Sequence, residues 1–232
     1  MLKLEGVSKI YNQGQSNQVN AVQDVDLEIF EGEMVALMGP SGSGKSTLLN
    51  LIGGLTPISH GVIKVDDEDV GGMNEEGRTA IRRDKIGFIF QHFNLLEFLT
   101  AVENVKLPLL IQGHPDDIAQ RRSTMLLREL GLGGRLELTP KELSGGQEQR
   151  VAIARSLITN PKIILGDEPT GDLDKASAEG VLKLFRRINK ETNQTLLLVT
   201  HDQNVGDKCD RIIRIADGKI VSTGLEKGMV AK

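Results

Sequence analysis

Residues 34–47 read MVALMGPSGSGKST, and this stretch decides the fold that the sequence predicts. The apolar run Met34–Met38 is typical of a strand that is buried on both faces, as in a parallel sheet covered by helices. A glycine-rich loop follows, and apolar residues at helical spacing then predict a helix that ends at Gly53-Gly54. A buried strand, a glycine-rich loop and a helix in this order predict an α/β protein.

The loop within this stretch fits the Walker A pattern, in which Gly39 is followed by four residues and then by Gly44, Lys45 and Ser46. Glycines let backbone N–H groups surround phosphate oxygens, and the start of a helix favours an anion. The lysine supplies positive charge to the β- and γ-phosphates, and the serine hydroxyl can ligate Mg²⁺. The loop therefore predicts a nucleoside triphosphate site formed by Gly39, Pro40, Ser41, Gly42, Ser43, Gly44, Lys45, Ser46 and Thr47.

A second apolar strand, Ile163–Leu165, is followed closely by two carboxylates. Asp167 suits the role of holding Mg²⁺ through a bound water. Glu168 stands at the exit of the strand, where a carboxylate can orient and polarise a water in line with the γ-phosphate. The sequence therefore favours hydrolysis of the triphosphate, with Glu168 as the candidate catalytic residue.

The composition excludes several classes of protein. The 232 residues, 39% of them hydrophobic, suit one sizeable domain or two small lobes with a packed core. A net charge of −4 and an aromatic content of 3% disfavour a nucleic-acid partner. The single cysteine, Cys209, excludes an intrachain disulfide and a zinc cluster of cysteines. Because no apolar run is long enough for a membrane helix and Met1–Glu5 lacks a signal-peptide core, we expect a cytoplasmic protein that can still dock on a membrane protein.

The rest of the chain predicts strands on both sides of a helical region. Leu2, Leu4 and Val7 begin an edge-type strand, and Asp217-Gly218 predicts a hairpin turn. From about residue 95 to 160 the pattern is helical. Other strands are expected at 25–29, 62–65, 86–90, 163–165, 196–199, 212–216 and 219–222, and other helices at 116–131, 147–157 and 181–188.

Between the Walker A loop and the strand that ends in Asp167 and Glu168, a short stretch reads LSGGQ. Its residues are Leu143, Ser144, Gly145, Gly146 and Gln147. With this signature in place, the chain resembles the nucleotide-binding subunit of ATP-binding-cassette (ABC) transporters over essentially its whole length. The resemblance implies the P-loop NTPase fold of ABC ATPases, with a RecA-like core, an antiparallel β subdomain and a helical signature subdomain. It also implies an ATPase with ATP and Mg²⁺ as its cofactors.

The same resemblance divides the single domain 1–232 into two parts. Residues 1–94 and 161–232 would form the nucleotide-binding core with the β subdomain. Residues from about 95 to 160 would form the helical subdomain.

The resemblance assigns roles to residues outside the phosphate loop. Tyr11 matches the aromatic residue that stacks on adenine, with ordinary aromatic packing as the alternative. Gln91 matches the glutamine that ligates Mg²⁺ and senses the γ-phosphate, so Ser46, Gln91 and Asp167 are the expected metal ligands. Asp172 and Asp174 belong to a segment that resembles the D-loop. His201 matches the switch histidine that contacts the γ-phosphate, and it joins Glu168 as a candidate catalytic residue.

The signature predicts a second anion site. Ser144–Gly146 stands just before the expected helix Gln147–Leu157, so glycine amides again lie at a helix N-terminus. One compact lobe does not readily bring both anion sites to one triphosphate. The family's arrangement is a head-to-tail pair in which the Walker A loop of one copy and the signature of the other enclose each ATP. We therefore expect a second copy of this chain as a partner across an isologous interface.

Residues 82–96, RRDKIGFIFQHFNLL, resemble one branch of the family, which contains macrolide-efflux, lipoprotein-releasing and FtsE-like cell-division ATPases. The segments 100–105 and 107–109 resemble it too. The branch implies an integral-membrane permease partner with four transmembrane helices and a large extracytoplasmic domain, and a peripheral place on the cytoplasmic face of the inner membrane. Phe88 and Phe90 are expected in the core, and Phe93 and Phe98 in the groove that receives the permease.

Three functions remain to be distinguished at this point. The first is the ATPase of a mechanotransmission-type export or lipoprotein-release complex. The second is an FtsE-like regulator that controls extracytoplasmic cell-wall enzymes without transport. The third, a soluble ABC protein of DNA repair or translation, predicts long coiled-coil insertions or a second cassette, and the sequence has neither.

Overall fold

The computed structural model describes residues 1–225, and its largest element is a six-stranded sheet with the order β10-β9-β3-β8-β7-β6. Neighbouring strands pair in parallel from β9 through β3, β8 and β7 to β6. The edge strand β10 pairs antiparallel with β9. The strands are β3 (Met34–Met38), β6 (Ile86–Ile89), β7 (Ile163–Asp167), β8 (Thr195–Thr200), β9 (Arg211–Ala216) and β10 (Lys219–Leu225). The predicted α/β class is confirmed.

This sheet separates two apolar cores, because successive side chains of a strand point to opposite faces. On β3, Ala36 packs into the core on the side of the helices, and Val35 and Leu37 pack into the other core with α1 (Lys45–Ile52) and the second sheet. All five residues of β3 are buried. Burial on both faces explains the uninterrupted apolar run and fixes the phosphate loop at the end of a rigid strand.

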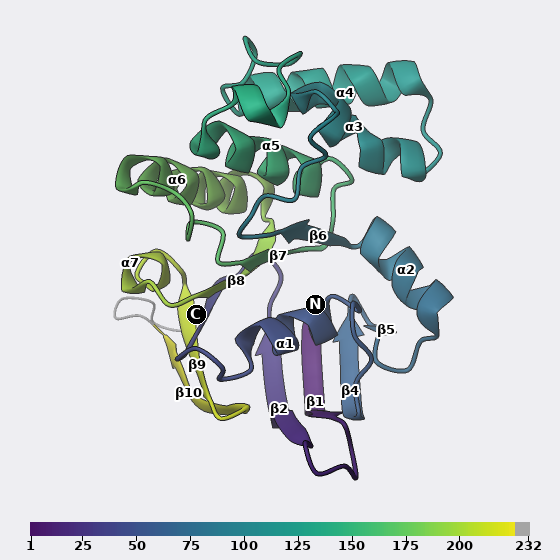
Figure 1. The fold of residues 1–232 in the computed structure, drawn as a ribbon, viewed down its shortest axis with the longest axis vertical. Helices are drawn as coiled ribbons and strands as arrows, with labels where there is room; N and C mark the ends of the chain where they lie inside the picture. Colours follow the sequence, from purple (N-terminus) through teal and green to yellow (C-terminus); the bar gives the residue numbers. More distant parts are fainter. Residues whose placement is uncertain (226–232) are drawn as a thin grey trace.

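A four-stranded antiparallel sheet with the order β2-β1-β4-β5 lies beside α1 (Figure 1). Its strands are β1 (Leu2–Tyr11), β2 (Val19–Ile29), β4 (His60–Val65) and β5 (Glu68–Asp69). The prediction of an edge strand at the N-terminus is wrong, because β1 pairs with both β2 and β4. Alternating burial arises here from one packed and one solvated face of the sheet, which gives a central strand the same pattern as an edge.

The helices between residues 101 and 157 lie on the opposite side of the large sheet from α1 (Figure 1). They are α3 (Ala101–Ile111), α4 (Asp116–Glu129), the 3₁₀ turn η1 (Pro140–Glu142) and α5 (Gly145–Leu157). As predicted, Asp116 and Asp117 open α4, and the chain turns away at Gly131 with a φ of 79°. After β7, α6 (Lys175–Thr192) packs its buried residues Val181, Leu184, Phe185 and Ile188 against the same core.

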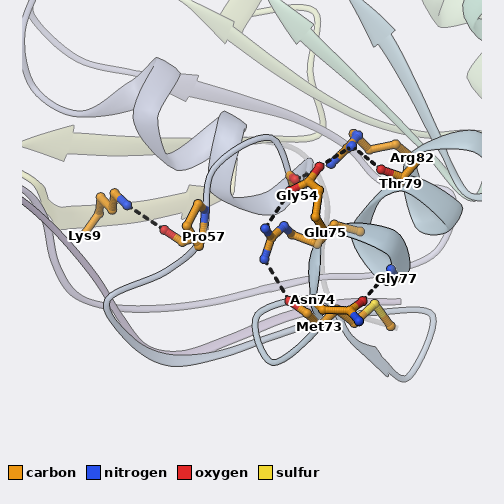
Figure 2. Close-up of polar contacts among 10 residues, drawn as sticks. Lys9, Gly54, Pro57, Met73, Asn74, Glu75, Gly77, Thr79 and Arg82 are labelled. Carbon is orange, nitrogen blue, oxygen red and sulfur yellow. Dashed lines mark hydrogen bonds and ion pairs between the residues drawn. The ribbon is translucent and has the colours of Figure 1, made fainter.

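Two helices were not predicted, α2 (Glu75–Asp84) and the short α7 (Gln203–Gly206). Only Ile81 of α2 is buried, and with Ala80 it is one of two apolar residues, too few to mark an apolar face in the sequence. Polar contacts hold it instead (Figure 2): Asn74 caps its start by accepting from Gly77 N, and Glu75 pairs with Arg78 and with Arg82. Within residues 1–225, no helix has both the length and the apolar composition needed to cross a membrane.

Candidate functional site

A cavity of about 1150 Å³ lies where the parallel strands end. Polar residues follow β3, β6, β7 and β8 at this edge, which is where open parallel sheets bind ligands. The predicted site residues that line it are Tyr11, Gly39, Pro40, Ser41, Gly42, Gly44, Lys45, Ser46, Thr47, Gln91, Asp167, Glu168 and His201. Residues from the two ends of the chain are thus brought to one site.

The phosphate loop holds its lysine in place through its own backbone. Lys45 Nζ donates to the carbonyls of Gly39 at 2.9 Å and Pro40 at 2.8 Å, and Lys45 is only 8% exposed. An ammonium has three donors, so these two bonds fix its position and leave one for a phosphate oxygen. The first N–H groups of α1 have no partner within the helix and add an anion-binding end. Ser43, a residue of the same loop, is buried and does not line the cavity.

Position 44 needs a glycine for two reasons, its left-handed backbone and the lack of room for a Cβ atom. Its φ is 100°, and a Cβ there would lie 2.3 Å from the carbonyl oxygen of Ala21. The β9–β10 turn also holds the loop, because Gly218 N donates to Ser43 O at 3.0 Å. A side chain at position 44 would therefore push the loop away from β2.

We expect Gly44→Ala to lower the free energy of unfolding by about 2 kcal/mol or more, from left-handed strain and from the clash with Ala21. Gly42→Ala is the matched control, since its φ is 78° and a Cβ there would meet nothing within 4 Å. That variant should lose only the strain, about 1–2 kcal/mol. Denaturant unfolding without nucleotide measures both, and equal losses would show that the clash is absent.

Ser46 and Asp167 bring a hydroxyl and a carboxylate together at the base of the cavity. Ser46 Oγ donates to Asp167 Oδ1 at 3.2 Å. Burial raises the pKa of Asp167, and the bond from Ser46 and the charge of Lys45 lower it in part. A partly desolvated carboxylate beside a hydroxyl gives oxygen donors of the kind that Mg²⁺ prefers.

Glu168 and His201 form a second pair at the mouth of the same strands. His201 Nδ1 lies 2.9 Å from Glu168 Oε1 and 2.8 Å from Oε2. Glu168 has a φ of 48°, a strained conformation for a residue with a side chain, and its N–H donates to Val199 O while its carbonyl accepts from Gly171 N. This unusual backbone turns the carboxylate out of the strand and into the cavity.

Gln91 reaches the cavity from the end of β6 and is tied to the D-loop segment. Its Nε2 donates to Asp172 Oδ1 at 2.8 Å, and His92 Nδ1 lies 2.7 Å from Asp172 Oδ2. The bond from Gln91, followed by that from His92, lowers the pKa of Asp172. Because the amide nitrogen is used in this bond, the amide oxygen is the atom left for a metal.

The signature residues Leu143–Gln147 lie outside the cavity. Ser144 caps the start of α5, and its N–H donates to Gln147 Oε1 at 3.0 Å. Asp174 caps the start of α6, where its Oδ1 accepts hydrogen bonds from the N–H groups of Ala176 and Ser177. The chain thus places the two predicted anion sites apart from one another.

A second cavity of about 450 Å³ lies between α2, β6, α3 and the end of α5. Phe88 and Phe90 line it and stack with ring centroids 5.5 Å apart. Phe88 packs against the core on the side of α1, as expected, and it also lines this cavity. Phe93 and Phe98 do not line it, and Phe98 is 79% exposed, so their place in a groove for the permease stays a prediction. The other lining residues include Arg82, Arg83, Leu107, Pro108, Ile111 and Arg155.

Six lining residues of the main cavity were missed from the sequence: Val19, Asn20, Ala21, Gln23, Asp217 and Gly218. They come from β2 and from the turn between β9 and β10. Asp217-Gly218 was identified as a turn, but its contact with Gln23, whose Nε2 donates to Asp217 O, joins positions 194 residues apart. No local pattern marks such a contact.

Comparison with known proteins agrees with this geometry. The family model described as "ABC transporter" matches residues 22–171. The chain is 45% identical over 221 residues to the lipoprotein-releasing system ATP-binding protein LolD 1 of Rhodopseudomonas palustris, covering 95% of this chain and 98% of that protein. It is 46% identical to the macrolide export ATP-binding/permease protein MacB of Syntrophobacter fumaroxidans, over 95% of this chain and 31% of that longer protein.

A solved relative has the same fold. The ATP-binding cassette MJ0796, in a dimeric post-hydrolysis state bound to ADP and Pi, superposes with a TM-score of 0.90 at 42% identity and covers 99% of this chain and 100% of its own. That state contains the products of ATP hydrolysis, and the cavity described above carries the phosphate loop and the acidic strand end. The chain therefore belongs to the ABC transporter family, as an ATP-binding and ATP-hydrolysing cassette of a transporter.

Proposed function

We propose that this ATPase drives a membrane permease of the mechanotransmission type, in export or lipoprotein release, by ATP-dependent pairing of two copies. The observation that carries the proposal is the separation of the two anion sites. The cavity gathers Lys45, Asp167 and Glu168, whereas Ser144–Gly146 lies elsewhere in the same copy. A second copy can supply the missing half of the site.

In this proposal ATP lies along the cavity from Tyr11 to the phosphate loop. The adenine stacks on Tyr11, and the amides of the loop surround the phosphates as far as Thr47. Lys45 gives its remaining donor and its charge to the β- and γ-phosphates. The lysine is already positioned by Gly39 and Pro40, so binding does not have to order it.

The residues present fit Mg²⁺, which the family uses. Ser46, Asp167 and the amide oxygen of Gln91 would hold it, and Ser46 Oγ already lies 3.2 Å from Asp167 Oδ1. When bound, the ion supplies positive charge to phosphate oxygens. The bond from Gln91 to Asp172 leaves that amide oxygen available without a change of partner.

Glu168 is proposed as the residue that orients and polarises the attacking water. His201 Nδ1 lies within hydrogen-bond distance of both carboxylate oxygens, and the left-handed backbone of Glu168 directs the side chain into the cavity. With Nδ1 occupied in this way, Nε2 of His201 remains for the γ-phosphate. In this proposal the pair would supply a base and a phosphate contact side by side.

The signature of the partner copy would close the site over ATP. The N-terminus of α5 presents the amides of Gly145 and Gly146, and Leu143 and Gln147 frame them. The solved relative MJ0796 is dimeric, which supports this pairing. Loss of the γ-phosphate contact on hydrolysis would weaken the interface and open the pair. Asp172 and Asp174 lie on the segment that follows Glu168, where the D-loop of the family meets the partner.

The permease would dock in the cavity lined by Phe88 and Phe90. Arg155 links that cavity to the nucleotide site, because it donates to the carbonyls of Phe93 at 2.9 Å and Asn94 at 2.6 Å. Both residues have left-handed backbones with φ of 59° and 48°, close to Gln91. We also propose a division of the chain into two parts. Residues from about 95 to 160 act as the helical subdomain, and residues 1–94 and 161–232 form the nucleotide-binding core with the β subdomain.

The MacB relative supports a permease partner, since its name includes a permease and this chain covers only 31% of its length. We propose that the permease of this chain is separate, with four transmembrane helices and an extracytoplasmic domain, and that the ATPase lies on the cytoplasmic face of the inner membrane. The alternative is FtsE-like regulation of cell-wall enzymes through a similar membrane partner. Only the first role moves a substrate.

We expect the chain to copurify with an integral-membrane protein from detergent-solubilised membranes, and this partner to change the rate of ATP hydrolysis. Reconstitution of the pair in vesicles then separates the two roles. ATP-dependent transfer of lipoprotein or another substrate supports export or release. Hydrolysis without transfer supports regulation, and recovery of the chain only from the soluble fraction would contradict both.

A further inference from the structure

Lys9 is a buried cation beside the nucleotide cavity. It lies on β1 and is 8% exposed, although lysines are seldom buried. Its Nζ donates to Pro57 O at 2.7 Å (Figure 2). Among residues 1–225 no carboxylate forms an ion pair with it, and burial lowers the pKa of the ammonium. Ion pairing therefore does not explain why this ammonium is buried.

The other contact of Lys9 is the ring of Tyr11. Lys9 Nζ lies 4.9 Å from the ring centroid, within the range of a cation–π interaction. Residues two apart on a strand share a face, so this contact follows from the extended backbone of β1. Tyr11 lines the cavity and Lys9 does not. A base in the cavity would meet the ring and not the ammonium.

The same segment is fixed to the loop after α1. Pro57 precedes β4, and Ser59 Oγ accepts from Ile10 N at 2.9 Å, while Ser59 N donates to Ser8 O at 2.9 Å. Since α1 begins at Lys45, these bonds connect the end of β1 with the element that carries the phosphate lysine. The ring is thus held at a set place relative to the phosphate loop.

We propose that Lys9 is a positioning residue for ATP, whose ammonium, anchored on Pro57, holds the Tyr11 ring as the platform for the base. The inference rests on the stacking role proposed for Tyr11. A cation on one face of the ring fixes its plane and draws electron density from it, which favours stacking of the electron-rich adenine on the exposed part. Lys9 then sets the affinity for the base without contacting the nucleotide.

The test compares a ligand with a base and one without. In the full chain, Lys9→Met should weaken binding of ATP about three- to tenfold in calorimetry. Binding of inorganic tripolyphosphate, which has no base, should stay unchanged. Lys9→Arg keeps a cation that can contact the ring, so it should restore most of the ATP affinity. Equal losses for both ligands would overturn the proposal, because they would indicate general damage to the cavity.

A spectroscopic signal reports the ring itself. The chain has one tyrosine and no tryptophan, so tyrosine absorption and fluorescence come from Tyr11 alone. Lys9→Met should shift this absorption and reduce the fluorescence change on adding ATP. Lys9→Gln is a second variant, with an amide that can still donate to Pro57 but no charge. Native ATP affinity and a native tyrosine spectrum in Lys9→Gln would show that the cation has no role.

Tyr11→Ala separates failure of this inference from failure of the stacking role. If Tyr11→Ala binds ATP as the native chain does, Tyr11 is not the platform and both ideas fall. If Tyr11→Ala weakens ATP binding and Lys9→Met does not, only the role of Lys9 is refuted. Tyr11→Phe keeps a ring for the ammonium and should bind ATP close to the native affinity.

Discussion

Glu168→Gln is expected to lower the rate of ATP hydrolysis by about 10²- to 10⁴-fold while ATP still binds. Glutamine has the size of glutamate and can adopt the same backbone, but it has no charge and cannot accept the proton of the attacking water. The bonds that fix the backbone at position 168, to Val199 and Gly171, do not involve the side chain. Phosphate release at saturating ATP measures the rate, and calorimetry measures the binding.

The same variant should accumulate a dimer in ATP, because the bound γ-phosphate is not removed. Size-exclusion chromatography with ATP and with ADP measures this, and the dimer should form in ATP only. Glu31→Gln is the matched control: Glu31 is exposed in the turn before β3, at the opposite end of that strand from the phosphate loop. Turnover near the native rate in Glu168→Gln would show that another group activates the water.

The parts of the site that the sequence predicts are those set by local structure. The run Met34–Met38 and the loop after it lie next to one another along the chain, and their geometry follows from a buried strand, glycine φ angles and a helix N-terminus. The carboxylates at the end of β7, Asp167 and Glu168, were predicted for the same reason. Parallel pairing of β3, β7 and β8 then brings these local units to one edge.

The parts that could not be predicted depend on long-range contacts or on polar packing. The approach of Asp217 to Gln23 depends on how two sheets meet. The helix α2 depends on Arg82, which pairs with Glu75 and donates to Gly54 O, and not on an apolar face. Phe88 lies on β6 and its stacking partner Phe90 directly after it, and the alternation of this segment does not reveal which face a cavity will occupy.

Lys45→Met is expected to weaken ATP binding about 10- to 100-fold, the loss of a charge-assisted hydrogen bond of about 1.5–3 kcal/mol. Methionine keeps an apolar stem at this buried position, so we expect the packing of α1 to be retained. The carbonyls of Gly39 and Pro40 lose the bonds at 2.9 and 2.8 Å that they accept from Lys45. Part of the loss therefore comes from a loop that must be ordered when ATP binds.

Two ligands separate these contributions, and an exposed lysine provides the control. The charge of Lys45 acts on the β- and γ-phosphates, so Lys45→Met should lower the affinity for ATP more than that for AMP, which has only the α-phosphate. If disorder of the loop were the whole effect, the affinity for both nucleotides would fall by the same factor. Lys183→Met, on the exposed face of α6, should bind ATP as the native chain does. Native ATP affinity of Lys45→Met in calorimetry would refute the phosphate role of this lysine.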